Sequence, residues 1–179
     1  NGTVLEEYTG NPIKGLRLYR LSEFAALDHQ GDKLTKEAWQ WVSTQLTDHS
    51  PLHLLHALHV QDGVVIIVDE DVDGGEIQLN ENFTESVVEE EPKSQTISVT
   101  SLWVFLARGA KLSLVEEFES SEGNAFTKRL CLSGFSLAEE SKLNYIRVQD
   151  VPRAVADHKQ LHLARVNAQV AARASFRMI

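Results

Sequence analysis

The sequence lacks most of the features that assign a chain to a specialised class of protein. Its one cysteine, Cys131, excludes an internal disulfide framework and a four-cysteine metal site, and favours a reducing compartment. No apolar run reaches the roughly 18 residues of a membrane-spanning helix. Lysine and arginine number 17 against 26 acidic residues, and this net charge of -9 argues against a general nucleic-acid-binding surface.

What is present is an ordinary globular composition with a repeat inside it. Between residues 97 and 179, short apolar alternations typical of strands are separated by turn signals such as Arg108-Gly109. Leu112, Leu143 and Ala174 follow one another at a constant offset of 31 residues. Four more apolar triplets share this offset: Val99, Leu130, Leu161; Val104, Phe135, Val166; Leu106, Leu137, Ala168; Leu114, Tyr145, Phe176.

A constant offset predicts stacked parallel coils, because one strand unit cannot bury its inner face alone. We therefore expect a mainly β chain forming a parallel β-helix, in which Leu112 stacks on Leu143 and Leu143 on Ala174. An antiparallel sandwich is the alternative, but it requires no constant offset.

The front of the chain differs from the repeat. Residues 32–46 have the apolar periodicity of an amphipathic helix capped by Asp32 or Thr35, and residues 22–27 predict a short helical turn. Residues 62–72 predict a turn and a strand, and the acidic stretch 85–96 predicts an exposed loop. We expect a small α/β region over 1–50 and a β-helix core over 51–179 that is incomplete at its C-terminus.

Four segments, in this order, resemble the SufB/SufD family of iron–sulfur cluster assembly proteins. They are "HLLHALHVQDGVVIIVDEDV", "ARGAKLSLVEEF", "FTKRLCLSGFSLAEESKLNYIRVQ" and "LHLARVNAQVAARASF". The resemblance extends from about residue 52 to residue 179. It implies a right-handed parallel β-helix that is not an enzyme and serves as a scaffold in a complex with SufB and the ATPase SufC.

Family members are longer, so the resemblance implies a fragment from the N-terminal part of the β-helix. Further coils and the SufB- and SufC-binding residues are then expected beyond Ile179. It implies no cofactor on this chain, since the full complex handles the iron–sulfur cluster. It also implies a cytoplasmic protein, or a plastid one in a photosynthetic eukaryote, and a homodimer is an additional expected assembly.

Three patterns suggest metal ligands. Asp69, Asp71, Asp73 and Gly74 match the start of a calcium loop, but Asn80 stands where a bidentate glutamate belongs, so an acidic turn between strands is favoured. The histidines of "HLLHALH", at 53, 56 and 59, drift off one helical face and are not expected to form a site.

The third pattern is a candidate metal or persulfide pair. Leu130 and Leu132 are expected to point inward and Cys131 outward, and the offset of 31 places Cys131 between Thr100 and His162. An outer polar position of the stack is the simpler interpretation.

Two other functions stay open. A carbohydrate-binding or carbohydrate-active β-helix needs charged residues on one outer strand face, and Lys111, Lys142 and Arg173 recur at the offset of 31. A general protein-interaction solenoid is the other alternative. No nucleophile–base pair, phosphate loop or pair of catalytic carboxylates occurs at telling spacing, so we expect no catalytic residues.

Overall fold

The computed structural model describes residues 13–27, 32–46, 62–83, 96–120, 127–150 and 161–179. This part of the chain is mainly β, with two helices. In chain order the elements are β1 (Leu16–Arg20), α1 (Leu21–Ala26), α2 (Lys33–Leu46), β2 (Asp62–Val68), β3 (Asp73–Phe83), β4 (Thr96–Leu106), β5 (Lys111–Ser120), β6 (Thr127–Leu137), β7 (Lys142–Asp150), β8 (Leu161–Val170) and β9 (Ser175–Met178).

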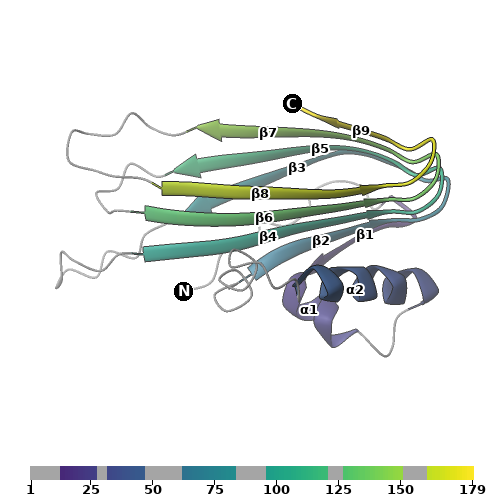
Figure 1. The fold of residues 1–179 in the computed structure, drawn as a ribbon, viewed down its shortest axis with the longest axis horizontal. Coiled ribbons are helices and arrows are strands. Elements are labelled where there is room, and N and C mark those ends of the chain that lie inside the picture. The colour runs from purple at the N-terminus through teal and green to yellow at the C-terminus, as the bar shows by residue number, and fades with distance from the viewer. Residues whose placement is uncertain (1–12, 28–31, 47–61, 84–95, 121–126, 151–160) are drawn as a thin grey trace.

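The strands form two sheets. Sheet A has the order β1-β2-β4-β6-β8 and sheet B the order β3-β5-β7-β9. Every pair is parallel except β1 with β2, which is antiparallel. Figure 1 shows the turns between the sheets gathered at one end and the helices beside β1 and β2. The antiparallel sandwich is thus wrong for these strands, and parallel stacking is confirmed.

Each strand of sheet A after β1 leads through a tight turn into a strand of sheet B. We call such a strand–turn–strand unit an arch; the four arches are β2–β3, β4–β5, β6–β7 and β8–β9. The third residue of each turn has a positive φ, namely Asp71, Gly109, Glu140 and Arg173. Gly109 suits this position most easily, because a glycine has no Cβ to clash there.

The predicted offset of 31 holds between the two middle arches and fails at the last one. Val104 pairs with Phe135, and Leu112 with Leu143. Leu143, however, pairs with Phe176, which is 33 residues later, so the predicted stacking on Ala174 is wrong. β8 and β9 both pair at an offset of 33 instead of 31. The two additional residues therefore lie in the connection between β7 and β8, and the alternation within each strand is unchanged.

The main core lies between the two sheets. Ile66, Leu106 and Phe135 from sheet A pack there with Leu114 and Tyr145 from sheet B, among others. A second core covers the outer face of sheet A, where Phe24, Ala38 and Val42 of the helices meet Trp103 and Leu132. Over β2, β4 and β6, sheet A is therefore covered on both faces, as parallel sheets usually are.

The two predicted helices are confirmed, as α1 and α2. α2 begins after Asp32, whose Oδ1 accepts hydrogen bonds from the backbone N–H and the hydroxyl of Thr35, both at 2.8 Å. This is an N-cap, which satisfies donors left unpaired at a helix start. The predicted boundary at residue 50 and the predicted loop over 85–96 fall almost wholly outside the described residues.

Candidate functional site

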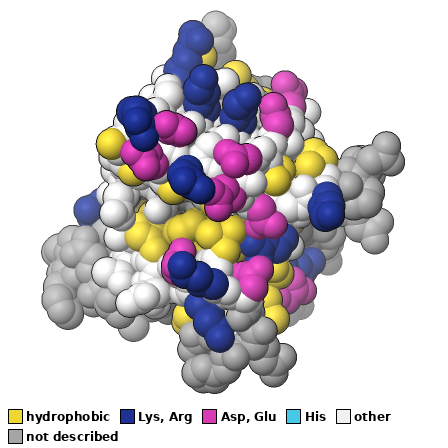
Figure 2. All heavy atoms as spheres, turned by 90° about the vertical axis from the view of Figure 1, so that its right-hand side faces the viewer, with side chains coloured by type: hydrophobic (Ala, Val, Ile, Leu, Met, Phe, Trp, Pro, Cys, Tyr) yellow, Lys and Arg dark blue, Asp and Glu magenta, His cyan; other side chains and the backbone are white. Residues whose placement is uncertain are grey.

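The stacked turns form a charged face (Figure 2). Arg108 pairs with Glu70 of the preceding arch, and Arg173 lies 2.6 Å from Glu139 and 3.1 Å from Glu140. The backbone N–H groups of Asp71 and Gly109 donate to carbonyls of the next turn, at 2.9 and 3.0 Å. Opposite charges thus alternate from arch to arch and largely neutralise one another.

The segment that resembles a calcium loop begins in the turn between β2 and β3, as the favoured interpretation predicted, and continues from Asp73 into β3. Asp69 binds Arg17, and Asp73 accepts a hydrogen bond from the backbone N–H of Gly75 at 3.0 Å. Within the described ranges, no group of three or more His, Cys, Asp or Glu side chains is placed to hold a metal ion. The absence of tight calcium binding stays a prediction.

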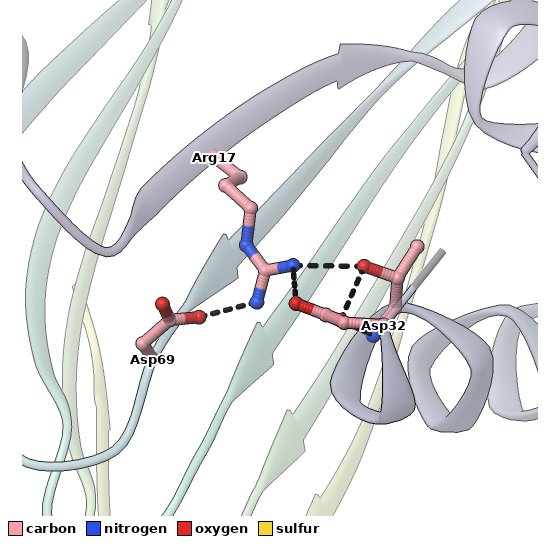
Figure 3. Close-up of polar contacts among 4 residues, drawn as sticks. Arg17, Asp32 and Asp69 are labelled. Atoms are coloured by element: carbon pink, nitrogen blue, oxygen red, sulfur yellow. Dashed lines mark hydrogen bonds and ion pairs between the residues drawn. The ribbon is translucent and has the colours of Figure 1, made fainter. Parts of the chain in front are cut away.

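Arg17 ties three separate elements together (Figure 3). Its Nη1 lies 2.8 Å from both Asp32 Oδ2 and Thr35 Oγ1, and its Nη2 donates to Asp69. The Thr35 backbone N–H holds the pKa of Asp32 down, to about 2, and Arg17 contributes to this. Burial opposes the charge of Arg17, but its bonds to Asp32 and Asp69 outweigh this and raise its pKa. The cluster joins β1, α2 and the first turn.

A second polar cluster lies buried between the sheets. Glu116 is 2% exposed on β5 and accepts a hydrogen bond from the Tyr145 hydroxyl of β7. Arg147 Nε lies 3.7 Å from the Glu116 carboxylate, and its guanidinium stacks over the Phe118 ring at 4.5 Å. Ser133 of sheet A is also hydrogen-bonded to Tyr145.

The chemistry of this buried cluster favours a structural role. Burial, and next the charge of Glu116, raise the pKa of Tyr145, so the phenol stays protonated and cannot serve as a base near neutral pH. The carboxylate is held by a hydroxyl and a guanidinium. Sequence reasoning missed this cluster, although the offset of 31 aligns Glu116 with Arg147 and could have revealed it.

The candidate pair Cys131 and His162 is not brought together by the register. Cys131 pairs with Thr100 as predicted, but on its other side it pairs with Ala164, and His162 pairs with Arg129. The adjacency was wrong because of the offset of 33. The side chain of His162 lies outside the described part of the structure.

The predicted outward direction of Cys131 is also wrong. Its side chain is buried, and its thiol lies 3.4 Å from the hydroxyl of Thr100. Leu132 packs instead against the helices on the outer face of sheet A. Because side chains alternate along a strand, Cys131 and Ser133 then face the interior. The prediction failed because it took apolar residues to mark the inner face alone.

The predicted basic stripe is shorter than expected. Lys111 pairs with Lys142, but Lys142 then pairs with Ser175, and Arg173 lies in the turn. The carbohydrate alternative therefore loses the third member of its stripe. The histidines at 53, 56 and 59 fall outside the described residues.

A groove lies between α2 and the outer edge of sheet A. Its volume is about 440 Å³, and it is lined by Trp41 and Gln45 of α2 and by residues 165–169 of β8. Asn167 donates to Gln45 Oε1 at 3.4 Å and accepts from Arg165 Nε at 3.2 Å. Sequence reasoning did not identify this groove, since its two walls are more than 100 residues apart.

A scan against protein-family models and a search of curated proteins found no match for this chain. Neither helix in the described ranges is long and apolar enough to cross a membrane.

Proposed function

We propose that this chain is a SufD-like, non-catalytic scaffold subunit for iron–sulfur cluster assembly. In this proposal the stacked arches are coils of a right-handed parallel β-helix. SufB and SufC are its partners, and the cluster is handled by the complex rather than by this chain.

The observation that carries the proposal is the placement of the family-like motifs. The segments "GAKLSLVEE" and "SKLNYIRVQ" cover most of β5 and β7, which pair in parallel with Lys111 beside Lys142 and Glu116 beside Arg147. The motifs that resemble the family therefore fall at equivalent positions of consecutive arches. This supports a repeated coil and agrees with what the resemblance implies.

The non-catalytic role has its own support. The polar residues gathered in the interior, Glu116, Tyr145 and Arg147, bond to one another and are shielded from solvent. A buried, mutually paired network rigidifies a core and offers no open position for a substrate. The single cysteine cannot supply the four thiolates that usually hold a cluster.

Affinity purification tests the proposal. The protein is tagged in its own host at its native level, and proteins retained after a high-salt wash are identified by mass spectrometry. SufB and SufC should be recovered together, and a tagged SufB should recover this chain in return. The scaffold role would be contradicted if the tagged chain recovered neither SufB nor SufC, and if tagged SufB did not recover this chain, although both tags were accessible.

Anaerobic reconstitution with iron and sulfide tests the absence of a cluster on this chain. The purified chain should show no stoichiometric absorption of an iron–sulfur cluster, whereas a mixture with its partners should. A stable cluster on the isolated monomer would show that the chain is a cluster carrier.

A further inference from the structure

The outer face of sheet B exposes apolar side chains in the middle of the sheet. Leu114 and Tyr145 face the interior, so Val115 and Ile146, the next residues of β5 and β7, face outward as register partners. Ile146 is 36% exposed and Val148 is 40% exposed. Both helices lie on the side of sheet A, away from β5 and β7 (Figure 1). Within the described residues, this face of sheet B is therefore left uncovered.

Two lysines stand side by side at one end of this face. Lys111 and Lys142 begin β5 and β7 next to the turns, are register partners and are exposed. Asp73 is the other neighbour of Lys111, but its carboxylate accepts a hydrogen bond from the Gly75 backbone at 3.0 Å. The other neighbour of Lys142 is Ser175. Neither lysine forms an ion pair with a described residue. Because the two ammonium groups repel each other, this end favours an acidic partner.

The other half of the face is acidic. Glu117 lies on β5 beyond the apolar residues, and its carboxylate accepts a hydrogen bond from the side-chain amide of Gln78 on β3 at 3.0 Å. A neutral amide leaves the negative charge of the carboxylate in place. Further along, the sequences of β5 and β7 continue to Glu119 and Asp150, which are register partners. The face thus runs from basic through apolar to acidic.

This order of residue types is complementary to itself when reversed. Val115 lies four residues after Lys111 and four before Glu119. β7 has the same order about Ile146, from a lysine to an aspartate. A two-fold axis that crosses the strands at this level makes the strands of a second copy antiparallel to those of the first. Each basic end then lies over an acidic end, and the apolar residues of the two copies meet between them. The two-fold arrangement with parallel strands would instead place lysine over lysine.

The axis runs along the direction in which the arches stack. It therefore places each strand of sheet B over the same strand of the other copy, as in a sandwich of two sheets about 10 Å apart. Such an interface needs no free strand edge, because side chains rather than backbone groups make the contact. Any further arch would lengthen it.

We propose that two copies of this chain pair face to face through the outer faces of sheet B, with antiparallel strands. Val115 and Ile146 form the apolar centre, and Lys111 and Lys142 contact the acidic end of the other copy. The contact surface is flat and partly polar, so the dimer is reversible and weakened by salt. This proposal goes beyond the scaffold role and does not rest on it.

Sedimentation equilibrium of the purified chain, at concentrations up to about 100 µM, tests the dimer. Replacing both Lys111→Glu and Lys142→Glu should raise its dissociation constant at least about tenfold. The matched control makes the same charge change on α2, with Lys33→Glu and Lys36→Glu, and should leave the dissociation constant unchanged. A monomer throughout this range, or equal weakening by the two double variants, would overturn the proposal.

A complementary variant makes the test specific. Glu117→Lys with Glu119→Lys gives a face that is basic at both ends and should not pair with itself. Mixing it with the variant that carries glutamate at 111 and 142 should restore association. Circular dichroism shows that each variant is folded. Failure of the folded pair to associate would contradict the antiparallel arrangement.

Cross-linking locates the interface. A carbodiimide joins an amine to a carboxylate in direct contact, and a mixture of isotopically light and heavy chains distinguishes links between copies from links within one. Links between copies should connect Lys111 or Lys142 to a carboxylate of β5 or β7. A dimer whose links all lie outside sheet B would show that another surface holds the two copies together.

Discussion

The strands at the two ends of the stacked sheets differ in their pairing and burial. At the first end, β1 pairs antiparallel with β2, and its Leu16 and Leu18 pack into the core between the sheets. At the other end, β8 and β9 are the outermost of the strands in the described residues. Val170 is 45% exposed there and Met178 is 50% exposed, although each occupies an interior position of the pattern.

The difference shows what ends a parallel stack. An antiparallel strand interrupts the series of equivalent strands, and the Arg17 cluster fixes it to α2 and to the first turn. Among the described strands, β8 and β9 of the last arch each have a neighbour on one side, and their apolar side chains are half-buried or exposed. The arches should therefore become less tightly packed from the middle towards β9.

Replacing Phe135 by alanine should have the largest effect. Its ring is fully buried and lies 4.8 Å from that of Tyr145. The cavity left behind should cost about 3–5 kcal/mol in the free energy of unfolding. Phe176→Ala in the last arch should cost less than half of this, because that site is already partly exposed. Urea denaturation of both variants measures the difference, and equal losses would show that the last arch is as tightly packed as the middle ones.

Two arginines in neighbouring arches provide a second comparison. Arg147→Ala should cost about 3 kcal/mol, because the nearly buried Glu116 loses its charged partner. Arg165→Ala on β8 should cost less than about 0.5 kcal/mol. Combining Arg147→Ala with Glu116→Gln should recover part of the loss. If the double variant were no more stable than Arg147→Ala, the carboxylate would not be the cause.

Substitutions in the turns should have a smaller effect on stability. Gly109 has a φ of 68°, and a Cβ there would lie 2.1 Å from Asp71 Oδ1, so Gly109→Ala should cost about 1–2 kcal/mol. Arg173 occupies the same turn position in the last arch with a φ of 59°. Arg173→Gly should change stability by less than about 0.5 kcal/mol, because relief of backbone strain offsets the lost ion pairs. Thermal melts compare the two, and a larger loss for Arg173→Gly would reverse the expected order.

The smallest expected effect concerns the N-cap at the first end. The folded-state pKa of Asp32, about 2, lies below the ordinary aspartate value of 3.8, so its carboxylate stabilises the fold above about pH 4 and stops doing so as the pH falls through 2. Asp32→Asn should cost about 1 kcal/mol at neutral pH, allowing for solvent screening of this exposed group. The difference from the unsubstituted protein should vanish near pH 2. A pH-independent difference in urea denaturation would mean that the charge plays no part.

Much of the fold could be predicted from local sequence patterns, whereas the candidate site could not be predicted from them. The alternation over 111–118 predicted β5, and the offset of 31 predicted its neighbour β7. The pairing of Cys131 with His162 failed, because it extended that offset through a connection of different length. β1 was not predicted at all, since its five residues become a strand by pairing with β2.

By itself, the sequence determined the strands of the middle arches, their turns, a helix start at Asp32 or Thr35 and the parallel stacking. These depend on side-chain periodicity and on residues adjacent in the chain. The tertiary structure alone decided the register of the last arch, the inward direction of Cys131 and the groove beside Arg165. The reason is physical: hydrogen bonding between strands sets their register whatever the length of the connection. In addition, α2 buries the outer face of sheet A, so apolar residues no longer mark which face is inside.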